Sequence, residues 1–292
     1  MRIATLLWDN RETVCLRTEY GYLPLEALDL KLGTRWSTEL KGLLCSGDFY
    51  RLWSWYRGNG RKALEAGGLG EIPFAAAPYA PLYRHPGKIW GIGLNYAAHA
   101  ADLSEKAPSG IPASFMKPDT ALIGHGDPVT IPVQSNRTTA EAELGIVIGC
   151  RCKSVPEADW QNVIAGFTPV IDMTAEDILR QNPRYLTLSK SFDTFFSFGP
   201  ELVTPDEVPD LAGLRVETVI NGRVHAHNLV ARMTFPPGFL VSFHSAAMTL
   251  LPGDVISTGT PGAARIRQGD EVTCRISGFT ELTNPVVDLN HA

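Results

Sequence analysis

The most informative stretch of the chain is residues 140–149, Ala-Glu-Ala-Glu-Leu-Gly-Ile-Val-Ile-Gly, an apolar segment with two carboxylates near its start. Side chains on a β-strand alternate between its two faces, so Glu141 and Glu143 are predicted to point the same way. Two like charges on one face of an apolar strand repel each other, and burying them is costly unless a cation compensates. Taken alone, this segment is equally consistent with a metal site and with a strand end on a solvated face.

A third carboxylate favours the metal site. Residues 163–172, Val-Ile-Ala-Gly-Phe-Thr-Pro-Val-Ile-Asp, form a second apolar stretch, which ends at Asp172. Three carboxylates with no His or Cys pair beside them suit a hard ion such as Mg²⁺ or Mn²⁺ better than Zn²⁺. We therefore predict a metal site with the ligands Glu141, Glu143 and Asp172.

The distribution of apolar runs predicts a β-rich α+β fold with two domains. Short apolar runs alternate with Gly and Pro at 89–93, 144–148, 216–220, 255–258 and 271–276. Asn221-Gly222 predicts a type I′ hairpin turn. Residues 1–80 read as a small N-terminal α/β domain, with strands at 3–8 and 13–17 and a helical stretch from Trp36 to about Ala66. Prolines 73, 78, 81 and 86 predict an extended linker, so we assign a main domain to residues 81–292, with its regular structure beginning near Lys88.

Composition narrows the class of protein. The chain has 292 residues, 44% of them hydrophobic, and its net charge of −5 is spread among interspersed acidic and basic residues. Nucleic-acid binding usually needs a clustered basic face, so no nucleic-acid partner is expected. The apolar run at residues 1–8 is too short for a signal peptide or a membrane span, which predicts a cytoplasmic protein without a membrane partner. The five cysteines are scattered and odd in number, so reduced thiols are expected.

A candidate general base lies in residues 91–102, Gly-Ile-Gly-Leu-Asn-Tyr-Ala-Ala-His-Ala-Ala-Asp. His99 and Asp102 are three residues apart, so on a helix they would share a face, and the carboxylate could orient the imidazole. The alternative is an ordinary surface pair. The Gly-x-Gly at its start is weak evidence for a dinucleotide site, because Tyr96 stands where a third glycine is needed.

Two lysines and a glycine-bounded turn complete the candidate residues. Lys117 and Lys190 each lie in a locally uncharged setting and could stabilise enolate or oxyanion charge, although a surface lysine is the simpler interpretation of either. Residues 251–262 run from a strand into a turn that contains Thr260. Its hydroxyl and the backbone amides could hold a carboxylate, and the alternative is a plain tight turn.

Taken in order, these segments resemble the fumarylacetoacetate hydrolase family over about residues 88–288. The motifs are Gly93-Leu-Asn-Tyr-x-x-His99, Phe115-x-Lys117-Pro, Glu141-x-Glu143-Leu, Asp172-x-Thr-Ala, Lys190-Ser-Phe-Asp-Thr-Phe, Pro252-Gly-Asp-Val-Ile and Thr258-Gly-Thr-Pro261. The resemblance implies a main domain of mixed, rolled β-sheets around a metal centre, usually as a homodimer. It also implies Mg²⁺ or Mn²⁺ on Glu141, Glu143 and Asp172, with Lys190 nearby and His99 as the base.

The chain also departs from the family pattern. Ile171, Glu176 and Leu179 stand where members commonly carry Asn, Arg and Gln, which puts substrate recognition in question. Arg180 or Arg184 could supply the lost positive charge. Hydrolytic members usually have Glu three residues after the His, whereas this chain has Asp102, with Glu105 as a possible substitute.

The resemblance implies hydrolysis of a carbon–carbon bond in a small 2-oxo acid or 1,3-dicarbonyl compound, such as an acylpyruvate or a fumarylacetoacetate-like substrate. In this hypothesis His99 and Asp102 activate water, Lys190 assists catalysis, and Tyr96, Lys117 and Thr260 contact the substrate. The same enolate would also serve an isomerase, a tautomerase or a decarboxylase. A third alternative is a ligand-binding protein that has lost turnover.

Overall fold

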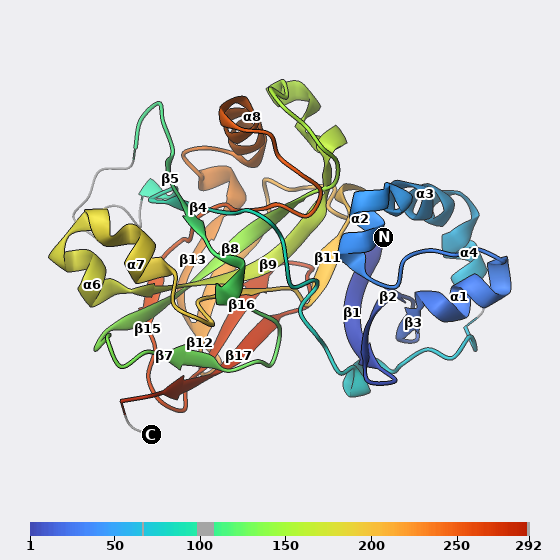
Figure 1. Ribbon diagram of the computed structural model, residues 1–292, viewed down its shortest axis with the longest axis horizontal. Helices are drawn as coiled ribbons and strands as arrows, with labels where there is room; N and C mark the ends of the chain where they lie inside the picture. The colour runs from blue at the N-terminus through green and yellow to red at the C-terminus, as the bar shows by residue number, and fades with distance from the viewer. Residues whose placement is uncertain (66, 98–107, 291–292) are drawn as a thin grey trace.

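The computed structural model describes residues 1–65, 67–97 and 108–290, which form two β-sheets with helices around them (Figure 1). The strands of the larger sheet are β1 (Arg2–Trp8), β2 (Arg11–Arg17), β3 (Tyr22–Pro24), β4 (Ile89–Gly93), β5 (Ala113–Lys117), β6 (Leu122–Ile123), β8 (Thr138–Ile148), β9 (Ile164–Ala175), β10 (Phe196–Phe198), β11 (Glu201–Val203), β14 (Val255–Ser257) and β15 (Ala263–Arg265). Those of the smaller sheet are β7 (Val129–Ile131), β12 (Arg215–Ile220), β13 (Arg223–Leu229), β16 (Glu271–Ile276) and β17 (Leu282–Asp288).

The long strands β8 and β9 lie at the centre of the larger sheet. Its main path runs β3-β2-β1-β11-β9-β8-β14-β4-β5, and the smaller sheet runs β13-β12-β16-β17-β7. Every residue of β9 is buried, as expected for a strand that is covered on both faces. Parallel and antiparallel pairs occur together in both sheets, which confirms the predicted mixed, β-rich α+β class.

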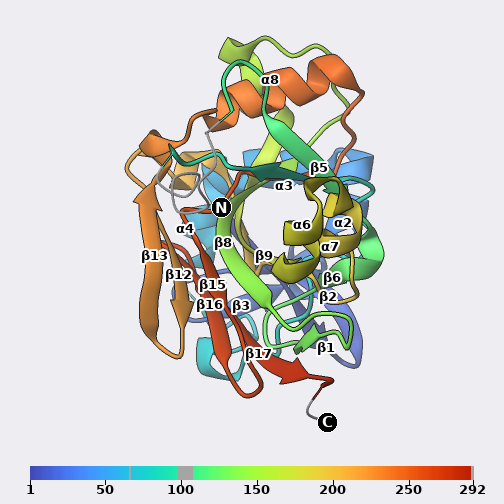
Figure 2. The ribbon, with the colours of Figure 1, turned by 90° about the vertical axis from the view of Figure 1, so that its left-hand side faces the viewer.

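Helices surround the sheets on three sides. In Figure 1, α1 (Leu25–Leu32), α2 (Leu40–Ser46), α3 (Asp48–Trp55) and α4 (Arg61–Leu64) lie beside β1–β3, whereas α6 (Glu176–Gln181) and α7 (Leu186–Lys190) lie at the opposite end and α8 (Pro237–Ala247) lies at the top. The view in Figure 2 places α6 and α7 in front of β8 and β9. Short 3₁₀ turns cover Phe74–Ala76, Asp119–Ala121, Glu157–Val163, Pro183–Tyr185, Pro205–Glu207 and Val230–Arg232.

The helical stretch predicted from Trp36 to about Ala66 forms as several pieces. It begins at Leu40, breaks at Gly47, whose φ of 80° ends α2, and contains a π-helical turn at Tyr56–Gly60 between α3 and α4. Trp53 and Trp55 are partly buried and pack against the hydrophobic core. These two tryptophans therefore have a packing role in this structure.

The N-terminal strands continue the sheet that holds the rest of the chain. β1 pairs antiparallel with β11, and the buried carboxylate of Glu201 on β11 accepts a hydrogen bond from Arg17 at 2.9 Å and another from Tyr22 at 2.6 Å. Residues 1–80 are thus attached by main-chain pairing and by the ion pair of the partly exposed Arg17 with the buried Glu201. The predicted domain boundary at residue 80 stays a prediction.

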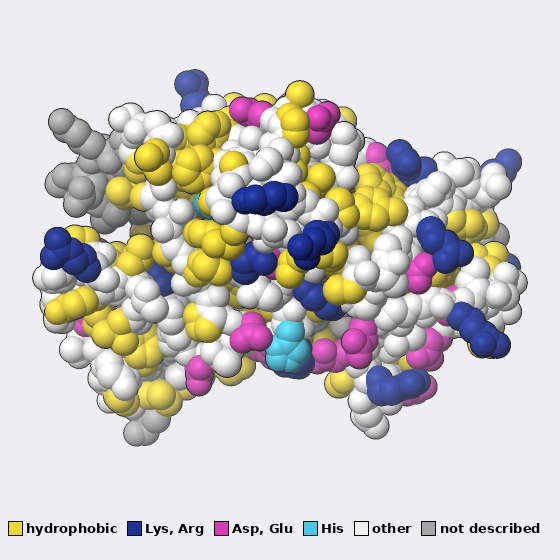
Figure 3. Space-filling view, turned by 45° about the horizontal axis from the view of Figure 1, so that its top comes forward, with side chains coloured by type: hydrophobic (Ala, Val, Ile, Leu, Met, Phe, Trp, Pro, Cys, Tyr) yellow, Lys and Arg dark blue, Asp and Glu magenta, His cyan; other side chains and the backbone are white. Residues whose placement is uncertain are grey.

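The hairpin turn predicted at Asn221-Gly222 is confirmed. Asn221 and Gly222 have φ values of 51° and 74°, the positive values that a type I′ turn between β12 and β13 requires. All five cysteines are free. On the face shown in Figure 3, acidic and basic side chains are interspersed. None of the described helices is long and apolar enough to cross a membrane.

Candidate metal centre and active site

Three carboxylates converge where β8 and β9 pair. Glu141 lies directly opposite Asp172 in this antiparallel pair, and Glu143 lies two residues further along β8 on the same face. One oxygen from each of the three side chains can be chosen so that all lie within 4.8 Å of one another. Asp172 is fully buried, Glu143 is 1% exposed, and the Glu141 side chain is 12% exposed. The alternation of side chains along β8 and the pairing of β8 with β9 therefore bring the three carboxylates together, as predicted.

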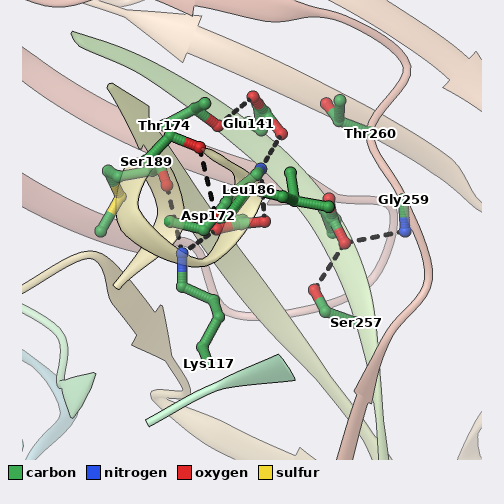
Figure 4. A network of polar contacts seen from close by, with 12 residues as sticks. Lys117, Glu141, Asp172, Thr174, Leu186, Ser189, Ser257, Gly259 and Thr260 are labelled. Atoms are coloured by element: carbon green, nitrogen blue, oxygen red, sulfur yellow. Dashed lines mark hydrogen bonds and ion pairs between the residues drawn. The ribbon is translucent and has the colours of Figure 1, made fainter. Parts of the chain in front are cut away.

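Two lysines from other elements contact the carboxylates. Lys190, at the end of α7, places its Nζ 2.9 Å from Glu141 Oε2 and 2.8 Å from Asp172 Oδ2. Lys117, at the end of β5, places its Nζ 2.5 Å from Asp172 Oδ1 and donates to the Met173 carbonyl at 3.1 Å. Figure 4 shows Lys117 pointing at Asp172. Three carboxyl groups thus share two ammonium groups.

Burial and charge shift the pKa values within the cluster. Burial lowers the pKa of Lys117 to about 8, although the Asp172 carboxylate opposes this shift. Burial also disfavours charged Lys190, but Asp172 and Glu141 outweigh it and hold the Lys190 pKa above its ordinary value. Burial, followed by the charge of Asp172, raises the pKa of Glu143 to about 8. Lys190 is therefore a cation at neutral pH, whereas Glu143 retains a proton there, which a bound metal ion would displace.

Glu143 is held by two donors that no sequence pattern predicts. Ser257 Oγ donates to Glu143 Oε2 at 2.5 Å, and the Gly259 backbone N–H donates to the same oxygen at 2.7 Å. Asn95 supports the Gly259 turn, because its Nδ2 donates to the Thr258 carbonyl at 2.7 Å. Both donors contact the same carboxylate oxygen, Oε2, and together they hold the Glu143 side chain in one orientation.

Glu141 is oriented in a similar way. The hydroxyl of Thr174 donates to Glu141 Oε1 at 2.7 Å, as Figure 4 shows, while Lys190 contacts Oε2. Thr174 lies two residues after Asp172 on β9, so it shares the face of the acidic cluster. The strand period could have identified this residue, whereas nothing in the sequence marks Ser257.

Two of the predicted substrate contacts, Tyr96 and Thr260, differ in the hydrogen bonds of their hydroxyl groups. Tyr96 is fully buried, its hydroxyl has no hydrogen-bond partner among the described residues, and burial and then Glu143 raise its pKa. Thr260 is also buried, but its hydroxyl hydrogen-bonds the backbone of Gly262, which makes it part of the turn. Tyr96 therefore has a free donor, and Thr260 would have to exchange its present contacts to bind a substrate.

The predicted base lies outside the described residues. His99, Asp102 and Glu105 all fall within 98–107, so their roles stay predictions. The described part of this segment ends at residue 97, after Asn95 and Tyr96.

One of the altered positions, Glu176 on α6, forms ion pairs with two arginines. Glu176 accepts from Arg137 Nε at 2.5 Å and lies 2.5 Å from Arg180 Nη2. The charge of Arg180 is thus paired with Glu176. Arg184 instead borders a surface groove with Tyr185 and Leu188. Neither of these arginines contacts the acidic cluster in the structure.

The chemistry of the donor set fits a hard divalent cation. Three carboxylates from two adjacent strands supply oxygen ligands only, as Mg²⁺ and Mn²⁺ prefer, and the group contains no thiol or imidazole that would favour zinc. Ionising all three buried carboxyl groups is costly unless a cation joins the two lysines in compensating their charge. The cluster is therefore a candidate metal centre.

Comparison with known proteins places the chain in a family. Residues 88–287 match the family described as Fumarylacetoacetate (FAA) hydrolase C-terminal. The chain is 33% identical to the mitochondrial oxaloacetate tautomerase Fahd2a of Rattus norvegicus over 235 residues, which cover 78% of this chain and 74% of that protein.

Two solved structures add to this comparison. A 5-carboxymethyl-2-hydroxymuconate delta-isomerase from Mycobacterium smegmatis has 37% identity and a TM-score of 0.67 over 74% of this chain and 82% of its own. A maleylpyruvate hydrolase from Sphingobium sp. SYK-6, in complex with manganese(II) and pyruvate, has 29% identity and a TM-score of 0.77 over 99% of both chains. With its matching motifs, its fold and its buried acidic cluster, the chain belongs to the fumarylacetoacetate hydrolase family.

Proposed function

We propose that this protein is a divalent-metal-dependent enzyme that cleaves a carbon–carbon bond in a small 2-oxo acid or 1,3-dicarbonyl compound by hydrolysis. The observation that carries the proposal is the buried cluster of three carboxylates in contact with two lysines. Such a cluster can hold both a cation and an anionic substrate head. The solved maleylpyruvate hydrolase, which matches along the whole chain, supports a hydrolytic reaction.

Glu141, Glu143 and Asp172 would hold Mg²⁺ or Mn²⁺. When bound, the ion supplies Lewis-acid polarisation of the substrate oxygens and fixes their position. Ser257 and Gly259 hold Glu143 in its orientation through hydrogen bonds from within the protein. This preorganisation means that little rearrangement is needed as charge develops.

The lysines would stabilise the negative charge that forms during cleavage. Lys190 stays protonated because of its two carboxylate contacts, so it can donate to an enolate or oxyanion. Lys117 has a pKa of about 8 and can also donate near neutral pH. The unpartnered hydroxyl of Tyr96 is a further donor.

In the proposed reaction, His99, oriented by Asp102, takes a proton from water, and the water oxygen bonds to the distal carbonyl carbon. The carbon–carbon bond then breaks, and its electron pair forms the enolate of the 2-oxo acid fragment. Protonation of that carbon releases a second acid. These roles of His99 and Asp102 are part of the proposal.

The second candidate is an isomerase or tautomerase. It is favoured by the identities with the delta-isomerase and the oxaloacetate tautomerase, and by a cluster that suffices for enolate stabilisation without activation of water. A decarboxylase would use the same enolate. In each of these reactions the base moves a proton on the substrate or is not needed.

Product analysis tests the proposal. The enzyme is supplied with acylpyruvates, a fumarylacetoacetate-like diketo acid and oxaloacetate, with Mg²⁺ or Mn²⁺ and again with EDTA, and products are identified by mass. EDTA-sensitive formation of two acids is expected. Metal-dependent conversion without a change in mass would move the protein to the isomerase candidate, and release of carbon dioxide would indicate a decarboxylase.

A further inference from the structure

A row of polar residues lies beside the metal row on the same face of the sheet. Thr139 on β8 pairs with Thr174 on β9 and with Arg265 on β15. Residues directly opposite each other in antiparallel strands share a face, and so do residues two apart on one strand. Thr139, Thr174 and Arg265 therefore line the face that carries Glu141 and Asp172, about 7 Å further along the strands.

Thr139 has a buried hydroxyl without a partner. Its side chain is 3% exposed, and its Oγ1 has no hydrogen bond to any described residue. The neighbouring Thr174 differs, because its hydroxyl donates to Glu141 at 2.7 Å. A buried hydroxyl without a partner is costly, and the cost is removed when a ligand or a water accepts its hydrogen bond.

Arg265 gives this row a positive charge at its outer end. The residue is exposed, and its Nη2 donates to the neutral backbone carbonyl of Asn136 at 2.9 Å. Among the described residues, no carboxylate forms an ion pair with this guanidinium group. The row thus runs from buried Thr174 through Thr139 to a cation at the solvent side.

We propose that Thr139 and Arg265 form a subsite for an anionic tail and so determine substrate specificity. The inference rests on the proposed function, in which the 2-oxo acid head lies at Glu141, Glu143 and Asp172. A five-carbon 2-oxo diacid, extended along β8, would place its second carboxylate at Thr139. The hydroxyl donates to that carboxylate and Arg265 supplies the opposite charge, whereas an alkyl tail would leave the hydroxyl unsatisfied.

Two probes of equal length isolate the tail. 2-Oxoglutarate and 2-oxopentanoate share a head and a chain length, but one ends in a carboxylate and the other in a methyl group. Oxalate offers the head chemistry alone. Dissociation constants of the Mn²⁺-loaded protein for all three are measured by calorimetry, for the wild type, T139V and T139S. Valine keeps the shape without the hydroxyl, and serine keeps the hydroxyl.

The wild type is expected to bind 2-oxoglutarate more tightly than 2-oxopentanoate. T139V is expected to weaken 2-oxoglutarate binding about tenfold or more, since a hydrogen bond to a charged group is lost. T139S should restore the preference, and oxalate should bind all three proteins equally. The subsite would be overturned if the wild type did not prefer 2-oxoglutarate to 2-oxopentanoate. It would also be overturned if T139V, with an unaltered melting temperature, kept the full preference. Failure of the wild type to bind oxalate in a metal-dependent way would instead overturn the proposed metal site, and the subsite with it.

Discussion

Replacing Lys117 by methionine is expected to destabilise the metal-free protein much more than the metal-loaded one. Lys117 is buried, and its Nζ lies 2.5 Å from the fully buried Asp172. Removing one partner of a buried ion pair costs about 3–5 kcal/mol. Because Lys190 still contacts Asp172, we expect the free energy of unfolding of the metal-free protein to fall by about 3 kcal/mol, near the lower end of this range. A divalent cation on the carboxylates would replace the lost positive charge, and much of the difference should be recovered when Mn²⁺ is saturating.

Urea unfolding at pH 7, below the Lys117 pKa of about 8, measures this effect with EDTA and with saturating Mn²⁺. Lys88 provides a matched control, because its Nζ lies 2.6 Å from the buried Asp254, which is not part of the acidic cluster. K88M should lower the free energy of unfolding equally in both conditions. An equal loss for K117M with and without Mn²⁺ would refute the reasoning, because the charge of Lys117 would then have no connection with a bound cation.

Three further changes test separate parts of the structure. S257A removes one of the two donors to Glu143 and should raise the Mn²⁺ dissociation constant about tenfold, as measured by calorimetry. S257T keeps the hydroxyl, so it should raise this dissociation constant less. G259A should lower the melting temperature, because the φ of Gly259 is +97° and an added Cβ would lie 2.7 Å from the Cβ of Asn95. An unchanged melting temperature would show that the turn can relax. Burial lowers the pKa of His244, whose Nδ1 lies 2.8 Å from the Leu240 carbonyl. The unfolded chain therefore binds more protons than the folded protein below pH 6.5, and the free energy of unfolding should fall as the pH drops through that range. In urea unfolding at pH 7 and pH 5, H244N should show a smaller fall than the wild type.

The sequence predicted the acidic cluster because strand geometry is local. The period of two placed Glu141 and Glu143 on one face, and the antiparallel pairing of β8 with β9 then set Asp172 opposite Glu141. Burial was harder to predict, since the apolar run began only at Leu144 whereas β8 begins at Thr138. The compensating lysines come from β5 and α7, and no local pattern relates them to the cluster.

The contacts that orient the ligands could not be read from residue types. The donor from Gly259 is a backbone N–H, which every residue except proline carries, and only the positive φ of the turn aims it at Glu143. The predicted helix at 36–66 was likewise divided by Gly47, whose left-handed conformation sequence periodicity does not show. Tertiary contacts and special backbone conformations thus account for what was missed.

The central claim is that Glu141, Glu143 and Asp172 bind a divalent cation on which turnover depends. Titration of the EDTA-treated protein with Mn²⁺, followed by electron paramagnetic resonance, tests it most directly, with D172N as the comparison. We predict one Mn²⁺ site per chain in the wild type and loss of that site in D172N. A wild-type protein that binds no Mn²⁺ or Mg²⁺, or a D172N variant that binds as the wild type does, would contradict the account.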